Sequence, residues 1–229
     1  MFEKLNSYKV LLQQYGFGRC LFRLSYDLKR KYGLLKRKYP TWHWPQKPLS
    51  YWLCKEVPSG VSEYRSFRED NAKNFFFPIG QPPQPPLEWA QDAICSAEAL
   101  LQGRFKYFSD KEAYLGYPQP DWFKNPFTGQ QDSAEKHWCD CEDFNPLRGD
   151  MKYIWEPSRF CWTYSLVRAY AVTGNEKYAE AFWRLVESWM KSNPPQMGPN
   201  WQCGQEIFFC FSMGFKGIGF ARRFTLITF

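Results

Sequence analysis

Two short stretches of the sequence combine a tryptophan with side chains that carry a carboxylate, a guanidinium or an amide. Two carboxylates can act as general acid and general base on a glycosidic bond when they lie about 6.5–9.5 Å apart. An indole ring beside them can stack on a pyranose ring. Glu156 and Glu206 are the one attractive carboxylate pair, although nothing in the sequence makes them face each other. The candidate residues are Trp155, Glu156, Arg159, Asn200, Trp201 and Glu206.

Each stretch also has a purely structural interpretation. Glu156 and Arg159 are three residues apart and can form an ion pair on a helix, with Trp155 packed behind them. Glu206 can be a first-turn carboxylate, which the positive end of a helix dipole favours, or it can orient Arg159. Both interpretations stay open at the level of the sequence.

The residues that could ligate a metal do not have the spacing of a metal site. The chain has eight cysteines, and its one close pair is Cys139 and Cys141, beside His137 and Asp140. Structural zinc sites use well-spaced pairs of ligands, and the nearby acidic residues lack the spacing of a calcium loop. We therefore expect no metal and no cofactor. His137 could be a general base, but a single loop histidine is more often a hydrogen-bonding residue.

The chain is basic and rich in aromatic residues. Its 229 residues include 30 Lys and Arg against 23 Asp and Glu, and 20% of them are aromatic. A net charge of +7 suits an anionic partner, such as nucleic acid, an anionic membrane surface or an acidic polysaccharide. The sequence has no nucleic-acid-binding motif and no stretch with the roughly 18 apolar residues of a membrane span. Most aromatic side chains are expected in the core.

The N-terminal 86 residues divide at Pro40. Residues 5–34 place apolar side chains near helical spacing and basic ones on other faces, which predicts an amphipathic helical region interrupted at Gly16 and Gly18. This region can be a docked surface helix, or it can contact a membrane surface or an anionic glycan. Residues 41–86 are rich in proline, which predicts an irregular connector.

The remainder of the chain is expected to be mainly α-helical. Residues 87–102 predict a helix that begins after a proline, and residues 104–108 predict a short strand. Residues 157–173 and 176–191 predict two antiparallel helices joined by a tight turn, and a third helix is expected near Gln205. The helix pair is similar to one tetratricopeptide unit, but no second copy follows at the roughly 34-residue offset that a solenoid needs.

Three stretches, in this order and spacing, resemble the N-terminal domain of bacterial heparinase II/III-like proteins. They are DWFKNPFTG at 121–129 leading to KHW at 136–138, GDMKYIWEPSRF at 149–160, and NPP at 193–195 followed by NWQCGQE at 200–206. The segment GLLKRKYP at 33–40 also resembles that group. The resemblance extends over most of the chain, to about residue 209.

The resemblance implies an incomplete (α/α) toroid of helical hairpins around a groove, followed in full-length relatives by a β-sandwich. It also implies a lyase that cleaves uronate-containing acidic polysaccharide by β-elimination. Such chemistry needs a polar group that neutralises the uronate carboxylate, a base for the C5 proton and an acid, usually a tyrosine, for the leaving oxygen. Loops at the ends of toroid hairpins form the groove, so the six candidate residues are the expected substrate-binding residues.

The sequence departs from the family pattern after Glu206. Three glycines between residues 214 and 219 do not sustain a helix, and the end of the chain has no clear period. In the family, the asparagine, histidine and tyrosine of the reaction lie further along, so we expect a truncated chain with little activity of its own. The expected organisation is a helical region at 1–40, a connector at 41–86, a partial toroid at 87–209 and an aberrant tail at 210–229.

Other functions stay open beside the lyase. An inverting (α/α) glycoside hydrolase would use the carboxylate pair, and a non-enzymatic module would be a helical scaffold or bind glycan without turnover. Relatives that degrade polysaccharide are often periplasmic, whereas the N-terminus here shows no export signal, so a cytoplasmic location stays possible.

Overall fold

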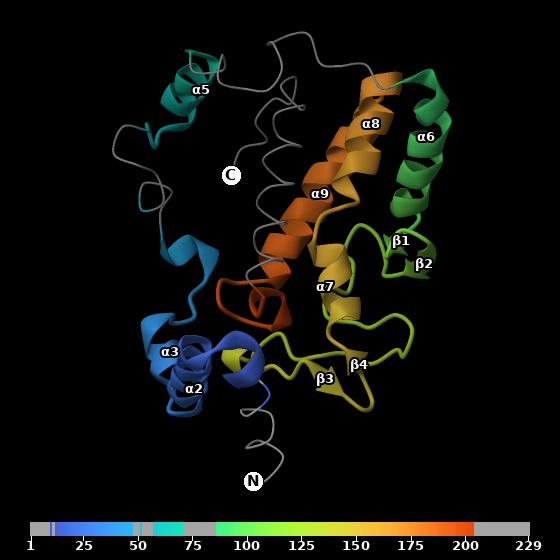
Figure 1. Ribbon diagram of the computed structural model, residues 1–229. Coiled ribbons are helices and arrows are strands. Elements are labelled where there is room, and N and C mark those ends of the chain that lie inside the picture. Colours follow the sequence, from blue (N-terminus) through green and yellow to red (C-terminus); the bar gives the residue numbers. More distant parts are fainter. Residues whose placement is uncertain (1–9, 11, 48–50, 52–56, 71–85, 204–229) are drawn as a thin grey trace. The chain divides into compact units, whose positions relative to one another are not determined.

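The fold is mainly α-helical, as the sequence predicts. The computed structural model describes residues 10, 12–47, 51, 57–70 and 86–203 (Figure 1). The chain divides into two compact units, Met1–Thr41 and Trp42–Phe229, and all six candidate residues belong to the second. In the part of the chain that the structure describes, no helix combines the length and the apolar character needed to cross a membrane.

The first unit contains helix α2 (Phe17–Lys31) and the short helix α3 (Leu34–Lys38), which contact each other. The predicted interruption at Gly16 is confirmed, because its φ of 78° is incompatible with a helix and α2 begins at the next residue. The interruption predicted at Gly18 is wrong, since that residue lies inside α2. Gly33, with a φ of 69°, separates the two helices.

Helix α5 (Val61–Asp70) corrects the prediction that residues 41–86 are irregular throughout. The prolines of this segment lie on either side of α5 and none lies inside it, so no proline ring interrupts its hydrogen bonds. A short 3-10 helix, η1 (Trp44–Gln46), precedes α5. The phenylalanines at 75–77 lie outside the described residues.

Helix α6 (Leu87–Leu101) confirms the helix expected after residue 86. Strand β1 (Arg104–Tyr107) confirms the expected strand, and it pairs antiparallel with β2 (Lys111–Tyr114). Gly103 joins α6 to β1 with a φ of 79°, and a Cβ there would lie 2.8 Å from the carbonyl carbon of Gly116. Only glycine fits this turn, which sets the start of β1 directly against α6.

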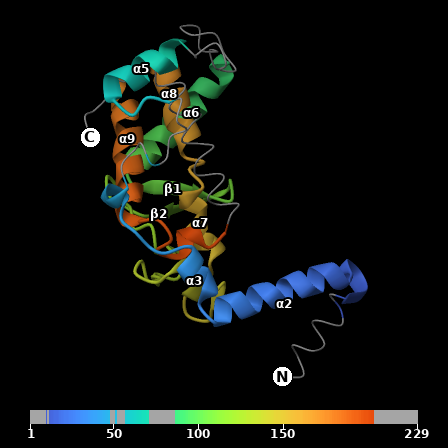
Figure 2. The same cartoon turned by 90° about the vertical axis from the view of Figure 1, so that its left-hand side faces the viewer.

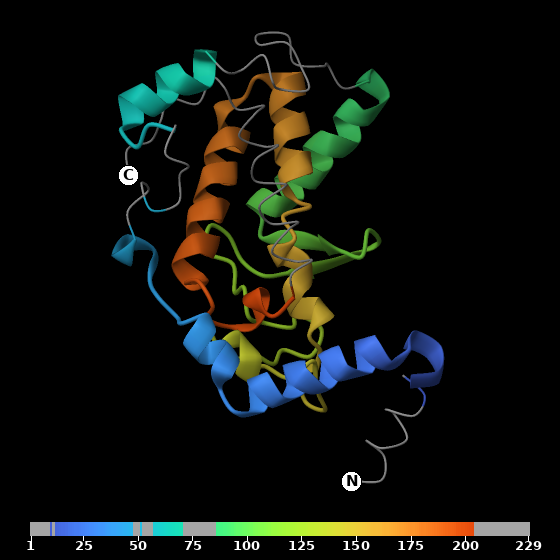
Figure 3. The ribbon, with the colours of Figure 1, turned by 60° about the vertical axis from the view of Figure 1, so that its left-hand side comes forward.

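Three helices form the rest of the second unit: α7 (Lys152–Ser158), α8 (Thr163–Thr173) and α9 (Glu176–Ser192). Helix α9 confirms the helix predicted over 176–191. Helix α8 contacts both α6 and α9 and runs antiparallel to each of them (Figure 3). The α8–α9 pair is the predicted helical hairpin, and its turn uses Gly174 in the left-handed region.

The prediction of one continuous helix over 157–173 is wrong, because α7 and α8 are separated by a break. Phe160 adopts a φ of 58°, which no helix accommodates. At the break, Trp162 Nε1 donates to the carbonyl of Pro157 at 2.9 Å, and Thr163 Oγ1 donates to the carbonyl of Phe160 at 2.7 Å. Both carbonyls also accept i+3 backbone hydrogen bonds, so the side chains add a second bond to each carbonyl at the break.

The core of the second unit is largely aromatic, and two of its buried indole groups are hydrogen bonded to serine hydroxyls. Trp122 Nε1 donates to Ser188 Oγ at 3.1 Å, and Trp189 Nε1 donates to Ser158 Oγ at 3.0 Å. These bonds let large rings be buried without leaving a polar group unsatisfied. Most of the described aromatic residues of the second unit thus belong to the core or pack against it, as expected.

Candidate functional site

Helix α7 carries two of the predicted site residues and is fixed at its start by the preceding loop. Asp150 Oδ1 accepts a hydrogen bond from the backbone N–H of Lys152 at 2.8 Å, which satisfies one of the first-turn donors. Trp155 and Glu156 are successive residues, so their side chains leave the helix about 100° apart and meet different neighbours. The sequence predicts a helix from residue 157 and so places both residues just before it, whereas the structure places them within this short helix.

The Glu156 carboxylate bonds to the C-cap residue of α7 and to the turn between β1 and β2. Its Oε2 accepts from Arg159 Nη1 at 2.7 Å, and its Oε1 accepts from the backbone N–H of Phe108 at 3.1 Å. The Glu156 side chain is 11% exposed and that of Arg159 is 24% exposed. The ion pair weighed from the sequence is therefore present, close to the surface, and it also binds the turn between β1 and β2.

The turn that Glu156 holds has an uncommon backbone conformation. Phe108 and Ser109 follow β1 with φ values of 51° and 73°, in the left-handed region that side chains with a Cβ rarely occupy. Such residues cost free energy and persist where the surroundings impose them. The bond from the Phe108 N–H to the α7 carboxylate is one such constraint, and the Phe108 side chain is 38% exposed.

Phe108 belongs to an aromatic cluster beside the ion pair. Its ring meets that of Tyr153 edge to face at 5.3 Å between centroids, and Phe127 meets Tyr153 at the same distance. Phe127 is 46% exposed. An exposed aromatic surface beside charged side chains is the chemistry that holds the apolar face and the polar rim of a sugar ring. Sequence reasoning missed Phe108, Phe127 and Tyr153, because only the turn geometry gathers them.

Tyr107 lies beneath this cluster. Its ring meets that of Phe127 at 5.3 Å, and the residue is fully buried. Burial raises the pKa of the Tyr107 hydroxyl, and the negative charges of Glu156 and Asp121 raise it further. Among the described residues its hydroxyl has no hydrogen-bond partner. A phenol with these properties stays protonated and cannot reach solvent.

The second predicted stretch lies against the other side of α7. The 3-10 helix η4 (Pro199–Trp201) contacts α7, and Trp155 Nε1 donates to the carbonyl of Pro199 at 2.9 Å. Trp155, Glu156, Asn200 and Trp201 therefore lie at the same end of the α8–α9 hairpin. The structure brings together five of the six predicted residues, and Glu206 lies outside the described residues.

Asn200 and Trp201 are buried and not exposed on the surface. Asn200 Nδ2 donates to Asn193 Oδ1 at 2.9 Å and to the carbonyl of Trp122 at 3.3 Å. Trp201 is 8% exposed, and its ring lies 6.0 Å from that of Trp189 between centroids. Their contacts position η4, and the buried ring of Trp201 has no open face on which a sugar could stack.

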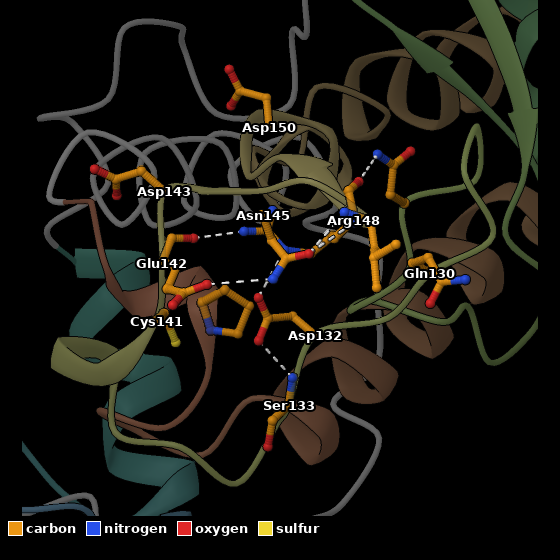
Figure 4. A network of polar contacts seen from close by, with 12 residues as sticks. Gln130, Asp132, Ser133, Cys141, Glu142, Asp143, Asn145, Arg148 and Asp150 are labelled. Carbon is orange, nitrogen blue, oxygen red and sulfur yellow. Dashed lines mark hydrogen bonds and ion pairs between the residues drawn. The ribbon is translucent and has the colours of Figure 1, made fainter.

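An ion pair between a buried arginine and a largely covered aspartate fixes the loop that leads into α7 (Figure 4). Arg148 Nε lies 3.0 Å from Asp132 Oδ2, with side-chain exposures of 4% and 11%. Arg148 Nη2 also donates to the carbonyl of Glu142 at 2.6 Å, and the Arg148 carbonyl accepts from Asn125 Nδ2 at 2.7 Å. This network ties together three parts of the loop, and sequence reasoning missed it because nothing in the spacing marks Arg148 as buried.

His137 and the loop around Cys141 make structural contacts. His137 is 8% exposed, and its Nδ1 accepts from the backbone N–H of Cys139 at 3.1 Å. Gln202 Nε2 donates to Asp143 Oδ1 at 2.6 Å and to the carbonyl of Cys141 at 3.1 Å. Within the described ranges, no group of His, Cys, Asp and Glu could hold a metal ion.

Comparison with known proteins identifies a family but no individual relative. The family model described as Heparinase II/III N-terminus matches residues 86–207, more than half of the chain. No curated protein and no solved structure matches the chain significantly. The matched region contains α6, the β1–β2 turn, the α7–η4 contact and the α8–α9 hairpin.

Proposed function

Because the chain belongs to the heparinase II/III family, we propose that it binds a uronate-containing polysaccharide through the surface at the C-terminal end of α7. The observation that carries the proposal is the Glu156 carboxylate, which links the Arg159 guanidinium to the turn bearing the exposed Phe108 ring. A cation and exposed aromatic rings thus occupy one surface of the predicted toroid domain.

The proposed ligand matches this surface in chemistry. A uronate carries a carboxylate, which a guanidinium binds with charge-assisted and often paired hydrogen bonds. Arg159 has five N–H donors, so its bond to Glu156 does not exclude a substrate carboxylate. The pyranose ring also has an apolar face, which would lie on Phe108 or Phe127.

The six predicted residues take two roles in this proposal. Arg159 and Glu156 contact the polysaccharide, whereas Trp155, Asn200 and Trp201 position η4 and α7 through their buried contacts. For Glu206 we keep the predicted substrate-binding role. These assignments place direct recognition on the β1–β2 side of α7.

We assign no catalytic residue among the described residues. β-Elimination needs a base that reaches the C5 proton and an acid that reaches the leaving oxygen. His137 caps a turn through Nδ1, and Tyr107 is buried with a raised pKa, so neither serves as base or acid at this surface. We therefore propose that the chain binds polysaccharide and contributes to lyase activity only together with further residues of the family's site.

Titration calorimetry of the full chain with oligouronates and with a neutral oligoglucan tests the proposal. We expect the acidic ligand to bind and the neutral one to bind at least tenfold more weakly. Arg159→Gln should lose most of the acidic binding, whereas Arg184→Gln, in an exposed pair on α9, should retain it. Equal binding of both glycans, or unchanged binding by Arg159→Gln, would overturn the assignment.

Product analysis separates the related functions. Rising ultraviolet absorbance, from an unsaturated uronate, would reveal lyase activity and contradict binding without turnover. New reducing ends without that absorbance would favour the hydrolase alternative.

A further inference from the structure

The excess positive charge of the protein is confined to the α2–α3 segment, defined here as residues 17–38. This segment contains eight Lys and Arg against one Asp, a net charge of +7, and the net charge of the whole chain is also +7. The remaining residues are therefore balanced in charge. The cations of the last turns are Lys29, Arg30 and Lys31 in α2 and Lys36, Arg37 and Lys38 in α3.

The same segment exposes an apolar face. Four residues of α2 recur at helical spacing on one side of the helix, and Figure 2 shows α2 as one uninterrupted helix. The exposed fractions of these side chains are 71% for Phe17, 56% for Leu21, 41% for Leu24 and 52% for Leu28. Arg19, Arg23 and Arg30 follow a separate stripe about half a turn away. The apolar stripe and the arginine stripe thus lie on opposite sides of α2.

Further exposed aromatic residues lie outside the apolar face, and aromatic rings contact the cations. Phe22 and Tyr32 are 71% and 67% exposed. The Lys31 ammonium lies 5.9 Å from the centroid of the Tyr32 ring, and the Arg23 guanidinium lies 5.6 Å from that of Tyr26. Amphipathic rings beside long basic side chains are typical of helices that lie at a membrane–water interface.

From these observations we infer that the α2–α3 segment binds the surface of a membrane that contains anionic lipids. The apolar face of α2 would enter the boundary between headgroups and acyl chains, and the cations would meet the lipid phosphates and carboxylates. An acidic polysaccharide could satisfy the cations but would leave the leucines in water. The exposed leucines therefore favour a lipid surface over a soluble polyanion.

Co-sedimentation of the full chain with vesicles tests this inference. We compare vesicles of phosphatidylcholine alone with vesicles of equal parts phosphatidylcholine and phosphatidylglycerol, at low and at high salt. We expect binding to the anionic vesicles and a marked loss of it at high salt, because the electrostatic attraction is screened. Equal binding to both vesicles, or binding to neither, overturns the inference.

Two variants test the two faces separately. Leu21→Glu/Leu28→Glu should abolish vesicle binding, whereas Leu147→Glu, at an exposed leucine of the second unit, should leave it unchanged. The triple variant Lys36→Gln/Arg37→Gln/Lys38→Gln should bind the anionic vesicles roughly 100-fold more weakly. Each cation removed should contribute about fivefold to this loss. Circular dichroism confirms that each variant folds.

Three outcomes would contradict the inference. If heparin abolishes all sedimentation while the leucine variant still binds vesicles, the segment is a polyanion site. If the leucine variant binds vesicles normally but loses a concentration-dependent dimer, the apolar face serves self-association. If the leucine variant binds vesicles normally and loses thermal stability, the apolar face packs within the chain.

Discussion

The Glu156 carboxylate accepts a hydrogen bond from the backbone N–H of Phe108 at 3.1 Å, although the two residues are 48 positions apart in the chain. This bond fastens the β1–β2 turn to α7. The Glu156 side chain therefore holds both the strained turn and the Arg159 guanidinium. Removing this side chain should have measurable consequences.

Glu156→Ala should lower the free energy of unfolding by about 2–3 kcal/mol, because both the Phe108 N–H and the Arg159 guanidinium lose their partner. Glu156→Gln should cost about 1 kcal/mol, since the amide oxygen can still accept one bond. Urea denaturation measures both. The matched control is Glu180→Gln, in an exposed pair, where less than about 0.5 kcal/mol is expected. Equal losses for Glu156→Gln and the control would refute the role of Glu156.

Phe127→Ala should weaken binding of an oligouronate by about tenfold, or about 1.4 kcal/mol, because an exposed ring is lost from the proposed sugar surface. Phe144→Ala removes an exposed ring from strand β3 (Phe144–Asn145) and should leave affinity unchanged. Titration calorimetry at matched ionic strength compares them. Similar losses for both variants would mean that binding is not localised at the α7 surface.

Arg148→Met should destabilise the protein by about 3 kcal/mol, because the largely covered Asp132 carboxylate then has no cation beside it. The double variant Arg148→Met/Asp132→Leu should recover part of this loss, since neither buried charge remains. Arg184→Met, in an exposed pair, is the control and should be nearly neutral. A double variant less stable than Arg148→Met would show that the pair is not the source of the effect.

The Glu98–Lys177 pair should make stability depend on pH at the acid end. The Lys177 ammonium and then the Tyr178 hydroxyl hold the pKa of Glu98 below its ordinary value of 4.5. A depressed carboxyl pKa contributes stability above the ordinary pKa, and this stability is lost as the pH falls through the folded-state value. The advantage of the wild type over Glu98→Gln should therefore shrink in denaturation series that run below pH 4.5. An advantage that grows on acidification would contradict the assignment.

Cys141 should react slowly with iodoacetamide. Burial raises the pKa of the Cys141 thiol to about 12, so almost no thiolate is present at pH 8. Cys95 and Cys161 are exposed and should be alkylated first. Peptide mass spectrometry over a time course measures the order. Early alkylation of Cys141 would show that the loop around it opens readily.

Local sequence determined the elements whose signals are local. The helices at 87–101 and 176–192 begin and end at proline, glycine and asparagine signals and carry a helical apolar period, so they were predictable. The break between α7 and α8 was not, because it depends on the Trp162 indole reaching the Pro157 carbonyl in the folded chain. Helix α5 is not predicted, because the high proline content of residues 41–86 as a whole argues against a helix. Residues 61–70 within that segment contain no proline.

The same distinction holds for the candidate site. Residue types and spacing selected Glu156 and Arg159, because an interval of three residues on a helix is enough to predict their ion pair. Tertiary structure decided that Trp201 is buried, that Phe108 and Phe127 are exposed beside the pair, and that Arg148 is paired with Asp132. Periodicity reports only which face of an element is apolar, whereas exposure and long-range pairing depend on which other elements cover that face.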